Sequence, residues 1–259
     1  MKSISSRDNP RLKRLRKWAS QGRSRREDAV VLLDGLHLID ALLASGGQIS
    51  EIVVSEHGIS KPEIAGWLTT HPQQEVLLVP DTLFADIAVT ESPSGIVGIG
   101  KVAATSPAPA TNIDCVLLDG VQDPGNLGTL LRTAAAAGIR QALLGVGCAD
   151  PWAPKTLRAG QGAQFQLAIH ENCDLVDFLQ CYQGNSIATR LDVSQSLYDA
   201  ALDGPLAWVF GSEGQGVSAP VAAAVRQGVQ IPMPGRVESL NVAAAAAICL
   251  FEVVRRRSR

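Results

Sequence analysis

Three glycine-rich loops carry polar side chains that could bind a small ligand and act on a substrate. Asn126 lies in the first loop and Arg132 follows it, Glu213 lies among three glycines in the second, and Ser239 and Asn241 close the third. Glycines permit tight bends and let a ligand approach the backbone closely. A carboxylate among glycines has little apolar packing to do. The loops match neither the G-x-G-x-x-G dinucleotide fingerprint nor a P-loop.

The third loop follows a short strand and leads into an alanine-rich helix. Its Pro/Gly-rich stretch, 232–235, leaves backbone N–H and C=O groups free to bind something small. The run of five alanines indicates that another element approaches the helix closely. Taken singly, the polar residues have structural explanations as well. Asn126, Ser239 or Asn241 could each cap a helix, and Arg132 could face water.

The elements that would position these loops alternate between strand and helix. Up to residue 101, apolar patterns predict strands at 30–33, 52–54, 76–79 and 96–99 and helices at 11–21, 36–43 and 62–70. Further along, they predict strands at 115–118, 142–144, 166–168, 186–188, 207–210 and 228–231 and helices at 127–137, 154–159, 175–180, 219–226 and 240–257. This alternation is typical of a mainly parallel sheet with helices on both faces.

The chain length predicts two domains, because 259 residues exceed the usual size of one. Residues 103–111 contain two prolines and no apolar pattern, as a linker would. We therefore expect a first domain at 1–102, a linker at 103–112 and a second domain at 113–259.

Cysteine usage and hydropathy favour a cytoplasmic protein. The five cysteines are odd in number and form no Cys-x-x-Cys pair, which argues for reduced thiols and against a disulfide scaffold or a metal site. The N-terminus lacks the apolar segment of a signal peptide. The longest apolar stretch, 242–251, is half as long as the ~20 residues that a membrane span needs.

Positive charge gathers at both ends of the chain. Residues 1–26 hold ten Lys and Arg against a single acid, and 255–259 add four arginines, although the whole chain has a net charge of −2. Such asymmetry favours contact with a polyanion such as nucleic acid. A solvated helix face is the alternative interpretation.

Taken together and in order, the three loops resemble the motifs of the SpoU (TrmH) family of RNA ribose 2′-O-methyltransferases, in the SPOUT superfamily. The matching stretches are 126–134, 210–216, 231–233 and 239–243. The resemblance covers the chain from about residue 113 onward. The preceding part is similar to the substrate-binding domain of a SpoU subgroup, and the stretches that carry this likeness are 9–11, 34–35 and 92–96.

The resemblance implies the fold, the cofactor and the partners. It implies an α/β SPOUT domain with a parallel sheet and a trefoil knot, preceded by a small α/β, L30e-like substrate-binding domain. It implies S-adenosylmethionine as the cofactor, bound largely through backbone groups, with Gly211, Ile231 and Leu240 lining its site. It also implies a homodimer with sites near the interface and structured RNA as the substrate, with rRNA favoured over tRNA.

The resemblance further implies a catalytic set, namely Arg132, Asn126, Glu213, Ser239 and Asn241. Arg132 matches the family's catalytic arginine, often described as a general base. A guanidinium very rarely gives up its proton, so we expect Arg132 to bind the adjacent phosphate and stabilise a developing alkoxide. We expect Asn126 to orient Arg132 or the ribose and Glu213 to hold a basic partner. Ser239 and Asn241 would fix the RNA or the loop.

Six cations are candidate RNA contacts: Arg7, Arg11, Lys13, Arg14, Lys155 and Arg158. For Lys155 and Arg158, a solvated helix face is an equally good explanation. Two other functions are weighed against the enzyme. A non-catalytic RNA-binding or ribosome-assembly factor on a methyltransferase fold would not need the intact catalytic set or any affinity for the methyl donor. A nucleotide-dependent oxidoreductase is disfavoured because the phosphate fingerprint is absent.

Overall fold

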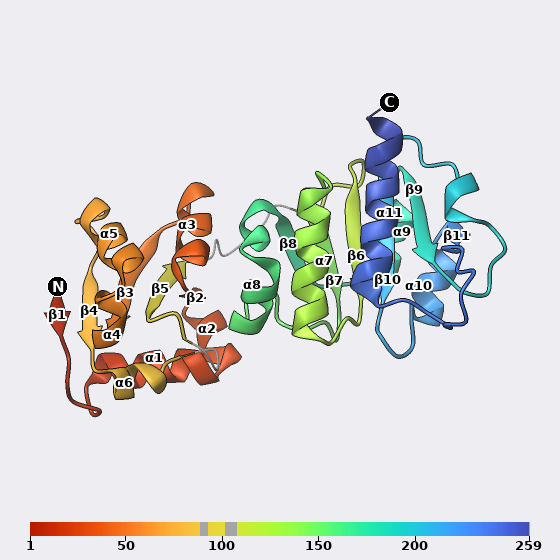
Figure 1. Ribbon diagram of the computed structural model, residues 1–259. Coiled ribbons are helices and arrows are strands. Elements are labelled where there is room, and N and C mark those ends of the chain that lie inside the picture. Colours follow the sequence, from red (N-terminus) through yellow and green to blue (C-terminus); the bar gives the residue numbers. More distant parts are fainter. Residues whose placement is uncertain (89–92, 102–107, 259) are drawn as a thin grey trace. The chain divides into compact units, whose positions relative to one another are not determined.

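The computed structural model describes residues 1–88, 93–101 and 108–258 and divides the chain into two compact units (Figure 1). Unit 1 comprises Met1–Thr105 and Trp152–Phe165, and unit 2 comprises Ser106–Pro151 and Gln166–Arg259. Half of the expected linker lies outside the described residues. So does Ser92, the first residue of the stretch 92–96 that resembles the substrate-binding domain. Within these ranges, no helix combines the length and apolar character that a membrane span requires.

Unit 1 is built on a mixed five-stranded sheet with helices on both faces. Its elements are β1 (Lys2–Ser3), α1 (Pro10–Ser20), α2 (Gly22–Glu27), β2 (Val30–Asp34), α3 (Leu36–Ala44), β3 (Ile49–Ser55), α4 (Glu56–Ile59), α5 (Pro62–Thr70), β4 (Val76–Val79), α6 (Asp81–Ala85), β5 (Ile96–Lys101) and α8 (Pro154–Gly160). The strand order is β1-β4-β3-β5-β2, with β5 antiparallel to both neighbours. Leu12 and Trp18 of α1 pack into the core on one face, and Ile39 and Leu42 of α3 into the core on the other.

The assignment of 152–165 to unit 1 differs from the expected domain boundary, which left this segment in the second domain. Leu157 of α8 is fully buried in the same core as Ile39 and Leu42. A Cβ atom added to Gly162 would lie 2.6 Å from the Cβ of Ala41, so the turn after α8 sits directly against α3. The apolar partners of this segment therefore belong to unit 1, although the sequence on either side of it belongs to unit 2.

Unit 2 is built on a six-stranded sheet in which every pair is parallel. Its elements are β6 (Cys115–Asp119), α7 (Pro124–Ala136), β7 (Gln141–Gly145), β8 (Ala168–Cys173), α9 (Leu175–Cys181), β9 (Asn185–Thr189), η2 (Leu197–Asp199), β10 (Leu206–Gly211), α10 (Ala219–Ala224), β11 (Gln227–Val229) and α11 (Val242–Arg257), with η1 (Ala163–Gln166) at the boundary of the two units. The order is β11-β9-β10-β6-β7-β8. The structure confirms the expected α/β class with a parallel sheet, while the trefoil knot stays a prediction.

Two layers of helices cover this sheet. In Figure 1, α7 and α11 lie side by side over one face. Alternate residues of β6 serve the two layers: Val116 and Leu118 pack with α7 and α11, whereas Cys115 and Leu117 pack with α9 and α10. This burial on both faces explains why the strand reads as an uninterrupted apolar run.

The predicted elements differ from the observed ones mainly at their ends. The strand predicted at 166–168 is wrong, because 163–166 form a 3₁₀ helix and β8 begins only at Ala168. The helix predicted at 127–137 begins earlier, at Pro124. The short elements β1, α2, α4 and α6 were not predicted, since two to six residues show no periodicity.

The arginine-rich end of α11 is used within unit 2. The guanidinium groups of Arg255 and Arg256 both donate to the carboxylate of Glu252, whose side chain is 7 % exposed. Arg256 also donates to the carbonyl oxygens of Leu197, Tyr198 and Ala200. The hydrogen bonds from Arg255 and Arg256 lower the pKa of Glu252 from 4.5 to about 2. These contacts explain this cluster of charge without an RNA partner.

We expect Glu252→Gln to lower the melting temperature at pH 7 by about 2–4 °C, which corresponds to a loss of about 1 kcal/mol. The pKa of Glu252 is lower in the folded chain, so its ion pairs stabilise the fold fully above pH 4.5 and are lost as pH falls toward 2. The difference between variant and wild type should therefore shrink over that window in thermal unfolding monitored by circular dichroism. Glu238→Gln, in an exposed loop, is the control; a difference independent of pH would contradict the assignment.

Candidate active site

The first two glycine-rich loops meet because they follow neighbouring parallel strands. β6 and β10 pair in register up to Asp119 and Gly211, so both chains leave the sheet at the same edge. The backbone N–H of Ser218 donates to the carboxylate of Asp119 at 2.7 Å, which ties the second loop to the first. A Cβ atom at Gly211 would lie 2.0 Å from the carbonyl carbon of Gly216, so the tight turn of this loop requires glycine there.

A chain of hydrogen bonds joins all three loops. Asn126 Nδ2 donates to Glu213 Oε1 at 2.9 Å. Asn241 Nδ2 donates to Asn126 Oδ1, also at 2.9 Å. Asn241 Oδ1 in turn accepts from the backbone N–H groups of Ala243 and Ala244, at 2.9 and 3.3 Å, and so caps α11. Three of the five predicted catalytic residues therefore form one connected network.

The groups at the two ends of this series of hydrogen bonds fix the direction of every hydrogen bond between them. Backbone N–H groups can only donate and an ionised carboxylate can only accept. Asn241 must therefore turn its oxygen toward α11, and Asn126 must turn its nitrogen toward Glu213. Neither amide can rotate by 180° without placing two donors or two acceptors face to face. Asn126, in the middle, is held in one orientation.

The structure changes two of the roles expected for these side chains. Asn126 does not cap α7: the cap is Asp123, whose carboxylate accepts from the N–H of Asn126 at 2.8 Å. Asp123 followed by Pro124 is a regular start signal for a helix, so the sequence did contain this cap. The contact observed for Glu213 is with the amide of Asn126 and not with a basic partner.

Arg132 and Ser239 remain outside the network. Both are exposed, and neither side chain makes a hydrogen bond or an ion pair with any residue that the structure describes. Arg132 lies six residues beyond Asn126 on α7, which is about 9 Å along the helix axis. Its guanidinium is therefore available to a substrate, and the expectation that Asn126 orients it finds no contact in this chain.

The expected cofactor residues lie at the same edge of the sheet. Gly211 and Ile231 are buried, while Leu240 is 37 % exposed. Between 231 and 240, no backbone N–H or C=O group makes a hydrogen bond with any other residue in the described ranges. A loop with unpaired backbone groups and an exposed leucine fits a ligand that is held through backbone contacts and carries an apolar face, as the adenine of S-adenosylmethionine does.

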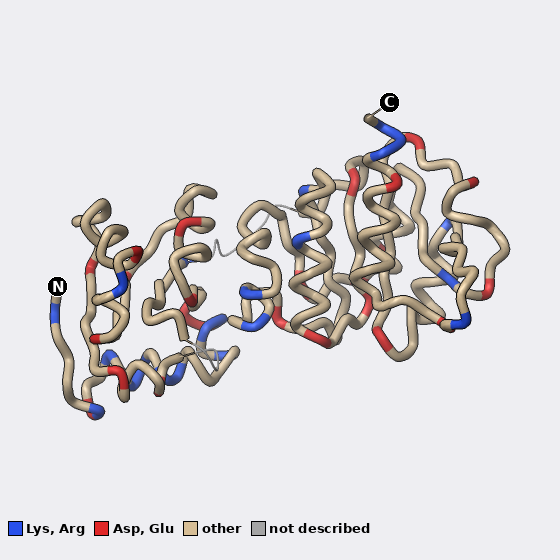
Figure 2. The backbone as a smooth tube through the Cα atoms, viewed as in Figure 1, with Lys and Arg blue, Asp and Glu red and all other residues tan. Residues whose placement is uncertain are grey.

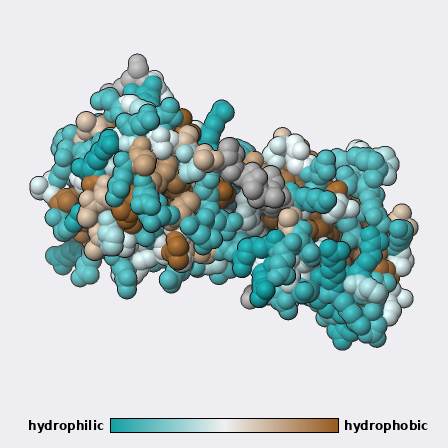
Figure 3. Space-filling view, turned by 180° about the vertical axis from the view of Figure 1, so that it is seen from behind, coloured by the Kyte–Doolittle hydropathy of each residue, from teal (hydrophilic) through white to brown (hydrophobic). Residues whose placement is uncertain are grey.

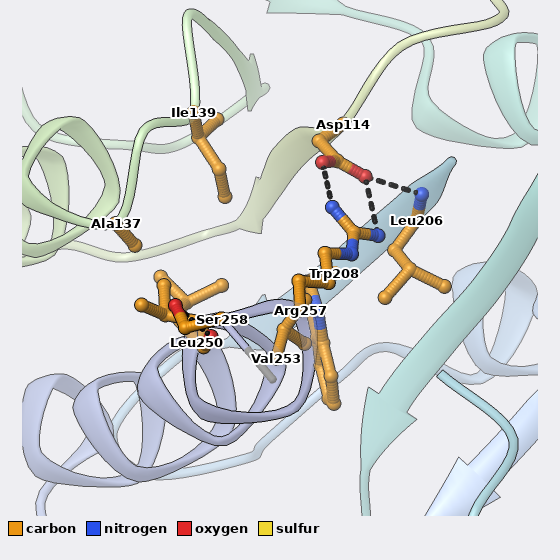
Figure 4. A pocket seen from close by; sticks show the side chains of 10 residues that line it. Asp114, Ala137, Ile139, Leu206, Trp208, Leu250, Val253, Arg257 and Ser258 are labelled. Atoms are coloured by element: carbon orange, nitrogen blue, oxygen red, sulfur yellow. Dashed lines mark hydrogen bonds and ion pairs between the residues drawn. The ribbon is translucent and has the colours of Figure 1, made fainter. Parts of the chain in front are cut away.

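A cavity in unit 2 lies at the opposite edge of the sheet from the three loops. It measures about 200 Å³ and is lined by residues that include Ile139, Trp208 and Val253 (Figure 4). Figure 4 shows Arg257 paired with Asp114 at its rim. Asp114 precedes β6 and Arg257 ends α11, so this cavity belongs to the amino ends of the strands and not to the three loops. The described residues include no cluster of metal-binding side chains.

Most of the predicted RNA contacts are paired within unit 1. Lys and Arg recur along α1 (Figure 2). Arg7 forms a bidentate pair with Asp86, and Arg11 pairs with two glutamates, Glu51 and Glu75. The others keep more freedom. Lys13 pairs with the exposed Asp8, and Arg14 lies over the ring of Trp18. Lys155 and Arg158 are exposed, and their side chains make no hydrogen bond or ion pair with the described residues.

Comparisons with known proteins agree with this geometry. Residues 115–251 match the SpoU rRNA Methylase family, and residues 9–98 match the MRM3-like substrate binding domain. The chain is 32% identical to the 23S rRNA (guanosine(2553)-2′-O)-methyltransferase RlmP of Bacillus subtilis, over 98% of this chain and 99% of the relative. It is 36% identical to an uncharacterised tRNA/rRNA methyltransferase of a Synechocystis species, over 98% of this chain and 94% of the relative. An AdoMet-bound rRNA methyltransferase from Sinorhizobium meliloti superimposes with a TM-score of 0.82 at 30% identity, over 98% of both chains.

The hydrogen-bond chain can be tested with Asn126→Asp, which puts a carboxylate where the amide of Asn126 now lies 2.9 Å from Glu213. Two adjacent carboxylates raise the pKa of one of them, so they should repel at pH 8 and share a proton near pH 5.5. We expect the variant to bind S-adenosylmethionine about tenfold more weakly than wild type at pH 8, with most of the loss recovered at pH 5.5. Isothermal titration calorimetry at both values measures this. Asn112→Asp, in an exposed loop, is the control. An equal loss of affinity for S-adenosylmethionine at pH 8 and pH 5.5 would contradict the assigned direction of the hydrogen bonds.

Proposed function

The chain belongs to the SpoU family of S-adenosylmethionine-dependent RNA 2′-O-ribose methyltransferases, and we propose on this premise that it methylates ribosomal RNA in the cytoplasm as a homodimer. The observation that carries the catalytic assignment is the hydrogen-bond chain through Asn126, which holds the three motif loops together. Two relatives that match nearly the whole chain are named as rRNA or tRNA/rRNA methyltransferases, which supports rRNA as the substrate.

The reaction needs a positioned ribose and a way to stabilise the oxygen that loses its proton. When bound, S-adenosylmethionine supplies the methyl group on a sulfonium centre. The free backbone groups of 231–240, together with Gly211 and Leu240, would hold it. Holding both reactants in line can supply several kcal/mol of the barrier.

Arg132 is our candidate for stabilising the ribose oxygen. Its guanidinium makes no hydrogen bond or ion pair with the described residues, so it can bind the phosphate beside the target ribose and face the developing alkoxide. Ser239, also exposed and two residues before Asn241, can donate to the RNA from the third loop. Asn126, Glu213 and Asn241 then act by keeping these loops in register around the reactants.

RNA recognition is assigned to unit 1, whose residues 9–98 match a substrate-binding domain. The side of this unit on which α1 lies in Figure 1 is covered with hydrophilic residues in Figure 3. Of the three predicted contacts on α1, Lys13 and Arg14 are held more loosely than Arg11: the partner of Lys13 is the exposed Asp8, and Arg14 lies 3.4 Å from Asp28. Arg7 and Arg11 would have to exchange acidic partners for phosphates.

The homodimer is assigned to the outer face of α11. The residues on this face recur at helical spacing, and they are Ala244, Ala247, Ile248, Phe251 and Arg255. Phe251 is 47 % exposed, which is unusual for a large aromatic side chain on a helix of small residues. A stripe of alanines around one phenylalanine suits close packing against a second copy. The five cysteines, all in described positions, are unpaired, as in a reducing compartment.

The function is tested by incubating the protein with labelled S-adenosylmethionine and total RNA from a strain that lacks its gene. We expect label in 23S rRNA and one ribose that becomes resistant to alkaline cleavage. Arg132→Ala should lower kcat by about 10²–10³-fold and leave the affinity for S-adenosylmethionine unchanged. Arg132→Lys should recover only part of this loss, because lysine lacks the guanidinium fork.

Arg140→Ala, an exposed arginine beyond the end of α7, is the matched control. Donor binding without any labelled RNA would favour a non-catalytic RNA-binding factor instead. Wild-type turnover by Arg132→Lys would exclude every role that requires the fork.

The dimer is tested with Phe251→Asp, which places a charge in the centre of the proposed interface. We expect the variant to sediment as a monomer in analytical ultracentrifugation, at a concentration where wild type is a dimer, because burying an unpaired carboxylate is strongly unfavourable. Tyr198→Asp, which changes another exposed aromatic residue of unit 2, should leave the dimer intact. A variant that remains dimeric with Asp at 251 would remove this face from consideration.

A further inference from the structure

A polar pocket lies in unit 1, and none of its lining residues belongs to the three motif loops. It measures about 160 Å³ and is lined by Asp34, His37, Leu38, Ser94, Arg158 and Gln161. Three separate stretches of sequence meet there: the end of β2 with the start of α3, the turn before β5, and the segment 152–165. Ligand pockets for whole drug-sized molecules are usually about 300–1,000 Å³. This pocket is therefore the size for one small polar group or a single nucleotide unit and not for a complete S-adenosylmethionine.

One wall of the pocket is held by hydrogen bonds within unit 1. Asp34 Oδ1 accepts from the hydroxyl of Ser94 at 2.6 Å and from its backbone N–H at 3.2 Å. The oxygen of the Ser94 hydroxyl also accepts from the backbone N–H of Ile96 at 3.3 Å. Because the β2 carboxylate fixes the turn that leads into β5, the shape of this wall does not depend on a ligand.

The opposite wall is held by the docking of α8. Leu157 is fully buried beside α3, and Gly162 lies against Ala41, so the residues between them have little freedom. Gln161, at the end of α8, adopts the left-handed conformation with φ 50° and ψ 36°. Glycine is the usual residue in this position because other side chains are strained there. Gln161 therefore carries a backbone strain that glycine would not, and such strain often accompanies a binding role.

Three polar side chains that line this pocket have hydrogen-bonding groups that are not used within the described residues. Arg158 and His37 are exposed, and their side chains make no hydrogen bond or ion pair with any residue in the described ranges. Gln161 Nε2 donates to the carbonyl of Arg158 at 2.7 Å, which leaves its carbonyl oxygen and its second N–H available. A guanidinium matches phosphate or stacks on a base, and a carboxamide matches the mixed donor and acceptor edge of a base.

We infer that this pocket binds one unstacked nucleotide of the RNA, with Arg158 on its phosphate and Gln161 and His37 on its base. This nucleotide is a recognition site in unit 1 and is not the ribose that receives the methyl group. Single-stranded loops and bulges supply such splayed bases in structured RNA. The inference rests on the proposed function for the identity of the ligand as RNA, and it extends that function by naming a specificity site.

Arg158→Ala and the control Arg23→Ala test the phosphate contact. Both remove one arginine charge from unit 1, but the Arg23 side chain is 87 % exposed, lies on α2 and does not line the pocket. The probe is a 23S rRNA transcript in equilibrium filter binding at several salt concentrations. We expect Arg158→Ala to bind about tenfold more weakly and to reduce the slope of log affinity against log salt by about one. Arg23→Ala should change affinity by less than about twofold.

Gln161→Gly separates a binding role from a structural one. The substitution relieves backbone strain, so the melting temperature should stay the same or rise. RNA binding should nevertheless weaken several-fold, with little change in the salt slope, because a neutral base contact is lost. His37→Ala should likewise weaken RNA binding several-fold with little change in the salt slope. His71→Ala is the control for His37→Ala, because His71 stacks on Trp67 and does not line the pocket.

These outcomes are independent of the methylation test, since they measure binding. If the pocket variants lose RNA affinity and the wild type methylates no RNA, the pocket is supported as an RNA-binding site and the proposed function is contradicted. The opposite pattern overturns the pocket: methylation proceeds, Gln161→Gly binds RNA as wild type does, and Arg158→Ala is no worse than Arg23→Ala.

Discussion

The in-register pairing of β6 with β10 is the constraint on which the site in unit 2 depends. It brings Asp119 and Gly211 to one edge of the sheet, so the loops that follow start side by side. Asp119 then holds Ser218, and Asn126 reaches Glu213. Parallel pairing also requires long connections between neighbouring strands. β11 is also parallel to its neighbour, so the chain leaves the sheet at this edge a third time, in the loop that contains Asn241. Residues far apart in the sequence meet because their strands are neighbours.

Sequence patterns predicted the strands better than the contacts between loops. Buried parallel strands give short apolar runs, and β4 was predicted at its observed bounds for this reason. The contacts of Asn126 with Glu213 and Asn241 span 87 and 115 residues, and no local pattern specifies them. The resemblance to a family brought these residues together, but it could not say which atom donates to which. That direction follows only from the fixed donors of α11 and the fixed acceptor on Glu213.

Charge and packing show the same limit of local reasoning. The basic residues of 1–26 were correctly seen as a cluster, but the acids that pair with Arg7 and Arg11 come from β3, the residue before β4 and the residue after α6. Net charge along a segment therefore overstates the charge that unit 1 presents to a polyanion. In the same way, apolar periodicity predicted α8 correctly, but it could not tell which core would bury Leu157.

The placement of α8 has a consequence for how substrate recognition is organised. The chain leaves the sheet of unit 2 after β7, supplies 152–165 to unit 1 and returns to form β8 beside β7. Arg158 and Gln161 thus belong to unit 1 by packing, yet both ends of their segment are anchored on neighbouring strands of the catalytic sheet. With the linker, three covalent connections join the two units where a simple two-domain chain would have one. The pocket therefore draws on sequence before and after the first motif loop, although packing assigns all of its lining residues to unit 1.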